Sequence, residues 1–208
     1  MKQADPSLLS EAGISTRLRT AYQPGVIAAR DGSAEYYEGV ALKCAAVLIP
    51  LARIEAEWQV VFTRRTDTVE HHKGQVSFPG GGCDRQEFVP EATALREAQE
   101  EIGLAREDVQ ILGRLNDVLT ITHYRVTPVV GSIPWPYTFT REPAEVDRVF
   151  HIPLSWLAER SHRREQPFTP DGYRRPFPVV VFDEYDGEVL WGATARMTLN
   201  FLQVLGLL

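Results

Sequence analysis

The chain has 208 residues, a length that suits one domain with a substantial buried core. Its content of 44% hydrophobic and 24% charged residues is typical of an ordinary soluble protein. The formal net charge of −6 argues against a general nucleic-acid binder, because binding to phosphates requires a basic surface.

No segment has the apolar length of a signal peptide or a membrane span, and the longest apolar run is residues 44–52. The two cysteines, Cys44 and Cys83, are too few for a disulfide framework and lack metal-ligand spacing. We therefore expect a cytoplasmic protein without a membrane partner, in which both cysteines are reduced thiols.

Helices and strands are expected to alternate along the chain. A first helix is expected to end at Gly13, and the helix after the glycine run is expected to begin at Pro90 or Glu91 and to end at Gly103. Helices are expected at residues 7–12, 91–102, 153–159 and 194–207. Strands are expected at residues 45–51, 59–63, 109–115, 124–133, 177–182 and 188–191, with hairpins at 54–58 and 186–187. This order predicts the α/β class, with an α/β/α sandwich around a mixed sheet.

Residues 160–178 stand apart because they are rich in proline and arginine. One interpretation is a solvated surface loop. The other is that arginines such as Arg174 and Arg175 clamp an extra phosphate, because a guanidinium group matches phosphate oxygens.

Three glutamates share one face of the helix expected after the glycine run. Glu97, Glu100 and Glu101 are spaced i, i+3 and i+4, which places them within an arc of about 100°. Like charges at this spacing repel, and hard oxygen ligands suit Mg²⁺ or Mn²⁺. The spacing is compatible with a metal site, but on an arbitrary helix it more often means a solvated acidic face.

Residues 96–104, Arg-Glu-Ala-Gln-Glu-Glu-Ile-Gly-Leu, resemble the second half of the Nudix box, and Gly82 lies where that box has its first glycine. The family usually has a glutamate six residues after that glycine, where this chain has Phe88 with Glu87 and Glu91 nearby. The resemblance implies a Nudix-type fold and a hydrolase that acts with divalent cations.

A second motif resembles the one that precedes the box in coenzyme A pyrophosphatases. It consists of residues 61–66, Val-Phe-Thr-Arg-Arg-Thr, and residues 74–81, Gly-Gln-Val-Ser-Phe-Pro-Gly-Gly. The chain departs from it at Glu70, where the motif usually has arginine, and Lys73 is the nearest basic residue. Segments near residues 126–130, 145–154 and 191–195 extend the likeness to about residues 45–201.

The resemblance implies specific roles for residues of the box. Glu97, Glu100 and Glu101 would be the metal ligands, Glu100 would also serve catalysis, and Arg96 would orient the acids. Glu145 matches a Glu-Val pair of the subfamily and would accept a proton or bind a further metal ion. The alternative for Glu145 is an ordinary acid at the start of a helix.

Basic and glycine residues before the box are expected to meet the substrate. Arg64, Arg65 and Lys73 would contact phosphates, although each alone is more often a surface charge. Gly80 and Gly81 would let the backbone approach metal or substrate closely.

These observations predict a hydrolase that cleaves the diphosphate link of coenzyme A or its thioesters to 4′-phosphopantetheine and adenosine 3′,5′-bisphosphate. The first alternative is a Nudix hydrolase for another nucleoside diphosphate derivative, such as ADP-ribose, a nucleotide sugar or a dinucleotide. The second is a binding module without activity. We expect residues 1–40 to be an extension that packs on a Nudix domain at residues 41–208, in a monomer or homodimer.

Overall fold

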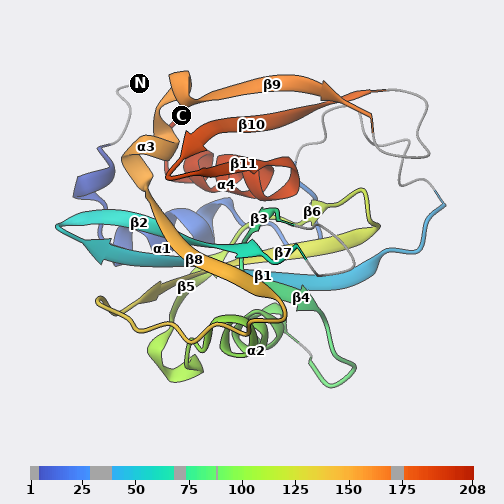
Figure 1. Ribbon diagram of the computed structural model, residues 1–208, viewed down its shortest axis with the longest axis horizontal. Coiled ribbons are helices and arrows are strands. Elements are labelled where there is room, and N and C mark those ends of the chain that lie inside the picture. Colours follow the sequence, from blue (N-terminus) through green and yellow to red (C-terminus); the bar gives the residue numbers. More distant parts are fainter. Residues whose placement is uncertain (1–4, 29–38, 68–73, 88, 170–175) are drawn as a thin grey trace.

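The computed structural model describes residues 5–28, 39–67, 74–87, 89–169 and 176–208 (Figure 1). Its α-helices are α1 (Glu11–Ala21), α2 (Pro90–Ile102), α3 (Leu154–Ala158) and α4 (Gly192–Val204). The 3-10 helices are η1 (Pro6–Leu8), η3 (Arg106–Asp108) and η4 (Arg160–His162). The strands are β1 (Lys43–Ile54), β2 (Glu57–Arg65), β3 (Val76–Ser77), β4 (Gly80–Gly82), β5 (Gln110–Arg114), β6 (Val118–Leu119), β7 (Tyr124–Ile133), β8 (Val146–Pro153), β9 (Arg163–Phe168), β10 (Phe177–Tyr185) and β11 (Glu188–Trp191).

The main sheet has eight strands and is mixed. Its central order is β3-β2-β1-β7-β5, with β4 paired to β1, β6 to β7 and β8 to β2. The β1–β7 pair is parallel, whereas β1–β2, β2–β8 and β5–β7 are antiparallel. Helix α2 covers one face of this sheet, and α1 and α4 lie on the other side (Figure 1). The predicted α/β/α sandwich around a mixed sheet is therefore confirmed.

Strand β1 separates two hydrophobic cores because its side chains alternate between the two faces of the sheet. Ala46 and Leu48 pack with the apolar side of α2. Ala45 and Ile49 belong to the core that also contains residues of α1 and α4. The acids of α2 are thus held on a helix whose opposite side is anchored in a fully buried core.

Helix α1 differs from the expected first helix. Gly13 does not end it but lies in its first turn, where the backbone N–H of Gly13 donates to the Ser10 side chain at 3.1 Å. The helix continues because Ile14 and Leu18, one turn apart, are both fully buried. A single glycine costs a helix about 1 kcal/mol relative to alanine, which this burial outweighs.

A second sheet of three strands, β11-β10-β9, lies beyond α4 at the top of Figure 1. Strand β9 falls in the segment interpreted as a surface loop, and that interpretation is wrong for residues 163–168. The strand is mostly exposed and lacks apolar alternation, so its pairing with β10 decides its conformation. Its arginines have structural partners, since Arg163 donates to three carbonyls at the end of α3 and Arg164 pairs with Asp183 at 2.7 Å.

The expectation of two free thiols is wrong. Cys44 and Cys83 form a disulfide, with their Cα atoms 5.4 Å apart. Cys44 comes one residue before Ala45, which is paired with Gly82 in the β1–β4 ladder, so the ladder brings the two cysteines together. Sequence spacing did not reveal this because the pairing joins segments 39 residues apart.

The remaining differences are strands that were not expected, namely β3, β4, β6 and the eight-residue β8. The β1–β2 and β10–β11 hairpins form as predicted. Among the helices in the described parts of the chain, none has the length and apolar character needed to span a membrane.

Candidate active site

Helix α2 carries the three predicted acids at very different depths. It begins with Pro90 and ends at Gly103, whose left-handed backbone (φ 66°) closes the helix as expected. The side chain of Glu101 is 3% exposed, that of Glu97 16% and that of Glu100 59%. The exposure of the acids therefore increases along this helical face from the sheet to solvent, and the face is not a uniformly solvated acidic face.

Glu101 is the deepest acid, and one of its oxygens has no partner. Its Oε1 lies 3.7 Å from Arg65 Nη1, and its carboxylate accepts a hydrogen bond from the backbone N–H of Gly80. Its Oε2 is buried without a hydrogen bond. Burial raises the pKa of Glu101 to about 8, against the opposing charge of Arg65. A buried, partly unsatisfied carboxylate of this kind fits a cation ligand.

Glu97 lies against the backbone of β4. A Cβ atom added to Gly81 would lie 2.7 Å from Glu97 Oε2 and nearer still to Oε1, so only glycine leaves room for this carboxylate. A Cβ on Gly80 would lie 2.5 Å from the carbonyl oxygen of Ala46, because β4 pairs closely with β1. Burial raises the pKa of Glu97, opposed by Arg96. The predicted close approach at Gly80 and Gly81 is thus toward β1 and Glu97.

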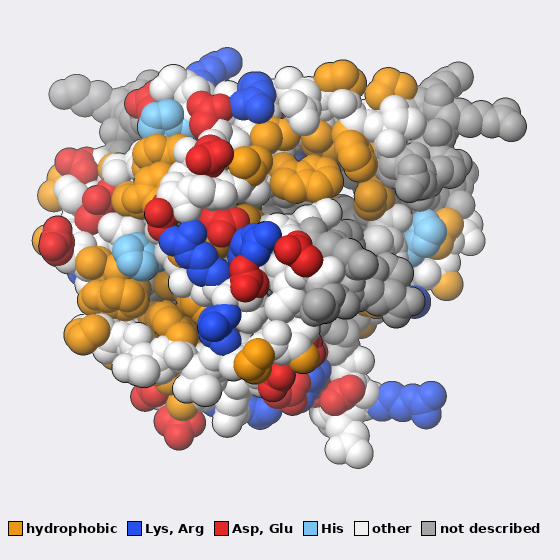
Figure 2. All heavy atoms as spheres, in the orientation of Figure 1, with side chains coloured by type: hydrophobic (Ala, Val, Ile, Leu, Met, Phe, Trp, Pro, Cys, Tyr) orange, Lys and Arg blue, Asp and Glu red, His pale blue; other side chains and the backbone are white. Residues whose placement is uncertain are grey.

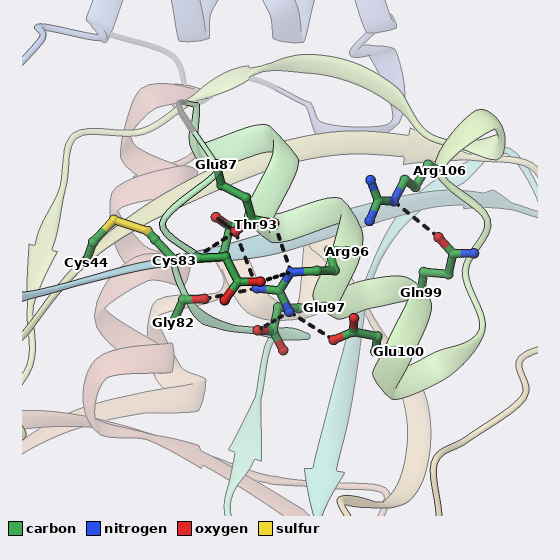
Figure 3. Close-up of polar contacts among 11 residues, drawn as sticks. Cys44, Gly82, Cys83, Glu87, Thr93, Arg96, Glu97, Gln99, Glu100 and Arg106 are labelled. Atoms are coloured by element: carbon green, nitrogen blue, oxygen red, sulfur yellow. Dashed lines mark hydrogen bonds and ion pairs between the residues drawn. A yellow bond between two sulfur atoms is a disulfide. The ribbon is translucent and has the colours of Figure 1, made fainter.

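Arg96 is the centre of the hydrogen-bond network in Figure 3. Its Nη1 lies 2.9 Å from both Glu97 Oε1 and Glu100 Oε2, and its Nη2 donates to the Gly82 carbonyl at 3.0 Å. Its Nε donates to Glu87 Oε1 at 2.8 Å. Arg96 therefore connects the acids of α2 to the glycine strand, in agreement with an orienting role.

Glu87 is the site residue to which the sequence analysis assigned no role. Besides Arg96, it accepts hydrogen bonds from Thr93 Oγ1 at 2.6 Å and from the Asp84 backbone N–H at 3.0 Å. The hydrogen bond from Arg96 is the main reason why its pKa falls to about 2. The signal in the sequence was a carboxylate one position before Phe88, which itself lies outside the described residues.

Glu100 is bound to Arg96 and largely exposed, so its predicted roles as metal ligand and in catalysis stay predictions. Within the part of the chain that the structure describes, no three acidic, histidine or cysteine side chains are arranged to hold a metal ion. Glu97 and Glu101 nevertheless fit a hard divalent cation, because Glu101 is buried, Glu97 is partly buried, both lie beside the glycine backbone of β4, and Glu101 Oε2 is unpaired.

Glu145 comes near the acids of α2 from a distant part of the chain. Its charge contributes to the raised pKa values of both Glu97 and Glu101. The preceding turn is fixed to α2, since the Glu142 backbone N–H donates to the Glu101 carbonyl at 2.8 Å. The side chain of Glu145 is exposed, which suits a group that exchanges protons with solvent.

The two neighbouring arginines of β2 point to different partners. Arg65 approaches Glu101, as described above. Arg64 pairs with Asp147, with Asp67 at 3.6 Å and with Glu188 at 3.7 Å. Basic and acidic side chains lie side by side in the middle of the face in Figure 2, where β8 runs below the small sheet. The structure thus brings Arg65 close to the acids of α2, whereas Arg64 pairs with other acidic residues.

Several residues of the sequence analysis lie outside the described part of the chain. They are Glu70, Lys73, Arg174 and Arg175. Their predicted roles stay predictions.

Comparison with known proteins agrees with this geometry. The family model described as the NUDIX domain matches residues 42–172. The chain is 37% identical over 153 residues to the uncharacterized Nudix hydrolase NudL of Photorhabdus laumondii, which covers 74% of this chain and 80% of that protein. It is 33% identical over 168 residues to the protein of the same name from Yersinia pestis, with 81% and 82% covered.

A solved structure shares the fold. The MutT/nudix family protein from Enterococcus faecalis superposes with a TM-score of 0.52 at 14% identity, covering 96% of this chain and 81% of that chain. The family model spans most of the chain, and its match includes Glu101 and the network of Glu87, Arg96 and Glu97. The chain therefore belongs to the Nudix hydrolase family.

Proposed function

We propose that this Nudix hydrolase cleaves the diphosphate link of coenzyme A or its thioesters, with Mg²⁺ or Mn²⁺, in the cytoplasm. The products are 4′-phosphopantetheine and adenosine 3′,5′-bisphosphate. The observation that carries the proposal is that the segment similar to the coenzyme A motif adjoins the acids. Arg65 and Gly80 contact Glu101, and Gly81 leaves space for Glu97.

The chemistry follows from the charge of a diphosphate. Adjacent phosphates repel an attacking hydroxide, so the site must neutralise charge and hold the link in line. Glu97 and Glu101 would hold a divalent cation, which would neutralise charge on the diphosphate and lower the pKa of a bound water. Arg65, 3.7 Å from Glu101, adds a positive charge for a phosphate oxygen.

The other side chains position and exchange protons. Arg96 holds the Glu97 carboxylate, and Glu87 holds Arg96. The exposed carboxylate of Glu145 is proposed to accept a proton, because it lies near both buried acids and remains open to solvent. Glu100 is proposed as a further ligand that would have to exchange its contact with Arg96 for the metal.

The second candidate is a Nudix hydrolase for ADP-ribose, a nucleotide sugar or a dinucleotide. It is favoured by Glu70, which carries a negative charge where the coenzyme A motif usually has arginine.

One assay separates the candidates. Coenzyme A, acetyl-coenzyme A, ADP-ribose, a nucleotide sugar and dNTPs are incubated with the protein and Mg²⁺ or Mn²⁺, and products are identified by mass spectrometry. We expect kcat/KM to be highest for coenzyme A or its thioester, with 4′-phosphopantetheine released. Higher kcat/KM for ADP-ribose or a nucleotide sugar would overturn the proposal in favour of the second candidate. Binding without turnover of any compound would point to an inactive binding module.

A further inference from the structure

A chamber of about 390 Å³ lies on the face of the main sheet opposite α2, between that sheet, α4 and the small sheet, and it reaches the acid site at its edge through Arg65 and Gly80. We propose that it holds the apolar, non-nucleotide arm of the substrate, immediately after the diphosphate that is cleaved. The inference rests on the proposed function for the position of the diphosphate, and it adds which part of the substrate is selected and how.

The chamber shares its edge with the acid site. Arg65 and Gly80 line the chamber, and the same two residues contact the buried carboxylate of Glu101. A diphosphate bound at Glu97 and Glu101 would therefore have one of its two substituents at the opening of the chamber.

The walls are mostly apolar and come from several elements, and their uncharged polar side chains are Gln75, Ser77, Thr120, Thr122 and Thr194. Val47 and Phe78 belong to the main-sheet side, and Phe168 and Phe177 to the small sheet. Trp191 leads into α4, and its ring lies edge-on to Phe168 with centroids 5.4 Å apart. Burial of a CH₂ group on such a surface is favourable without any hydrogen bond.

The hydroxyl groups of the walls are engaged with the protein itself. Ser77 Oγ lies 3.0 Å from Thr63 Oγ1, and Thr120 Oγ1 lies 3.0 Å from Thr122 Oγ1. Thr194 Oγ1 donates to the Val76 carbonyl at 3.1 Å.

These contacts decide between the two substituents of the diphosphate. A nucleobase carries several ring and amino nitrogens that need partners, and burying them unpaired is costly. The branched aliphatic carbons that directly follow the phosphate in pantetheine have no such need, whereas its hydroxyl and two amides need partners beyond these walls. Among the described residues, the charged side chains that line the chamber are the cations Arg65 and Arg196, and Arg65, which also lies 3.7 Å from Glu101, suits a phosphate at the opening. The apolar arm is therefore the occupant that the walls favour.

The size of the chamber implies a limit on the arm. Its volume of about 390 Å³ is at the lower end of the range of roughly 300–1,000 Å³ typical of small-molecule sites. Affinity should rise with each added methylene and then level off when the chamber is full.

The test uses alkyl esters of α,β-methylene-ADP, with chains from methyl to dodecyl, whose bridge cannot be hydrolysed. Their Kd values are measured by isothermal titration calorimetry in the presence of Mg²⁺. We expect Kd to fall by about fourfold per methylene over the first part of the series. A Kd that does not depend on chain length would overturn the proposal.

Two variants locate the effect in the chamber. Ala193→Phe, in the first turn of α4, fills the chamber and should weaken the binding of the long-chain esters far more than that of the methyl ester. Ala12→Phe places the same side chain at an exposed position of α1 outside the chamber and should behave as wild type. If Ala193→Phe does not fold, Ile121→Ser, in a turn that lines the chamber, should make the dependence shallower. Equal weakening of all esters by a folded variant would contradict the proposal.

The outcome is separable from that of the proposed function. If Kd falls with chain length but the protein does not hydrolyse coenzyme A, the role of the chamber is supported and coenzyme A is rejected as the substrate. Hydrolysis of coenzyme A, together with Kd values that do not change with chain length, would support the proposed function and reject the role of the chamber.

Discussion

The substitution Glu87→Gln tests how much the negative charge of Glu87, as distinct from the space that its side chain fills, contributes to stability and activity. The glutamine fills the same space and can still accept a hydrogen bond from Thr93 or the Asp84 backbone. It removes the negative charge that faces Arg96, whose Nε and Nη2 lie 2.8 and 3.4 Å from the two oxygens of Glu87. Arg96 in turn would hold Glu97 and Glu100 less firmly.

The magnitude follows from the pKa of Glu87. Its fall from the ordinary 4.5 to about 2 corresponds to about 3 kcal/mol, at about 1.4 kcal/mol per pKa unit. Arg96 and Glu87 keep 18% and 12% of their side-chain surface exposed, and water therefore screens part of this interaction. We expect Glu87→Gln to lower the free energy of unfolding by about 1–2 kcal/mol at pH 7.

The sign of the pH dependence is determined by the lowered pKa. The stabilisation is fully present above pH 4.5, where the carboxylate is ionised in both folded and unfolded chains, and it is lost as pH falls through about 2. The glutamine has no such titration. Wild type and variant should therefore differ most above pH 4.5 and converge near pH 2.

The assay is urea unfolding of both proteins at pH 7, 5, 3 and 2. Glu107→Gln, at an exposed position, is the matched control and should change the unfolding free energy little at any pH. Activity measured in parallel should fall roughly 10–100-fold, as for partners that orient metal ligands. A difference between wild type and Glu87→Gln that is absent at pH 7, or that stays the same at pH 2, would refute the reasoning.

Three further changes test the site. Glu101→Gln should lower kcat by orders of magnitude, yet it should raise the melting temperature of the EDTA-treated protein more at pH 8 than at pH 5. The reason is that burial raises the pKa of Glu101 to about 8, so the folded state opposes ionisation of this carboxyl group from pH 4.5 upward. Equal melting temperatures of variant and wild type at pH 8 would contradict this. Gly81→Ala should displace the Glu97 carboxylate, and we expect kcat to fall in a steady-state assay, with unchanged kcat as the contrary result. Reduction of the Cys44–Cys83 bond should lower the unfolding free energy by up to about 4 kcal/mol, because it opens a loop of 39 residues. Urea unfolding with and without dithiothreitol measures this loss, which a Cys44→Ala/Cys83→Ala variant should not show.

The sequence predicted the local parts of this protein well. The i, i+3, i+4 spacing of Glu97, Glu100 and Glu101 specified one helical face, and Gly103 specified the end of the helix. Asp186-Gly187 specified a hairpin in the same way. These features depend on residues within one or two turns of one another, so their physical causes are readable from spacing and residue type.

The tertiary structure alone decided which distant residues meet. The β1–β4 ladder joins Cys44 to Cys83, which spacing did not suggest. The fold also gives the three acids unequal burial and brings Glu145 near them. Such contacts depend on strand pairing and on how helices cover the sheet, and these are set by burial of the whole chain. The sequence by itself therefore determined the helix and its acids, and the packed sheet determined their depth and partners.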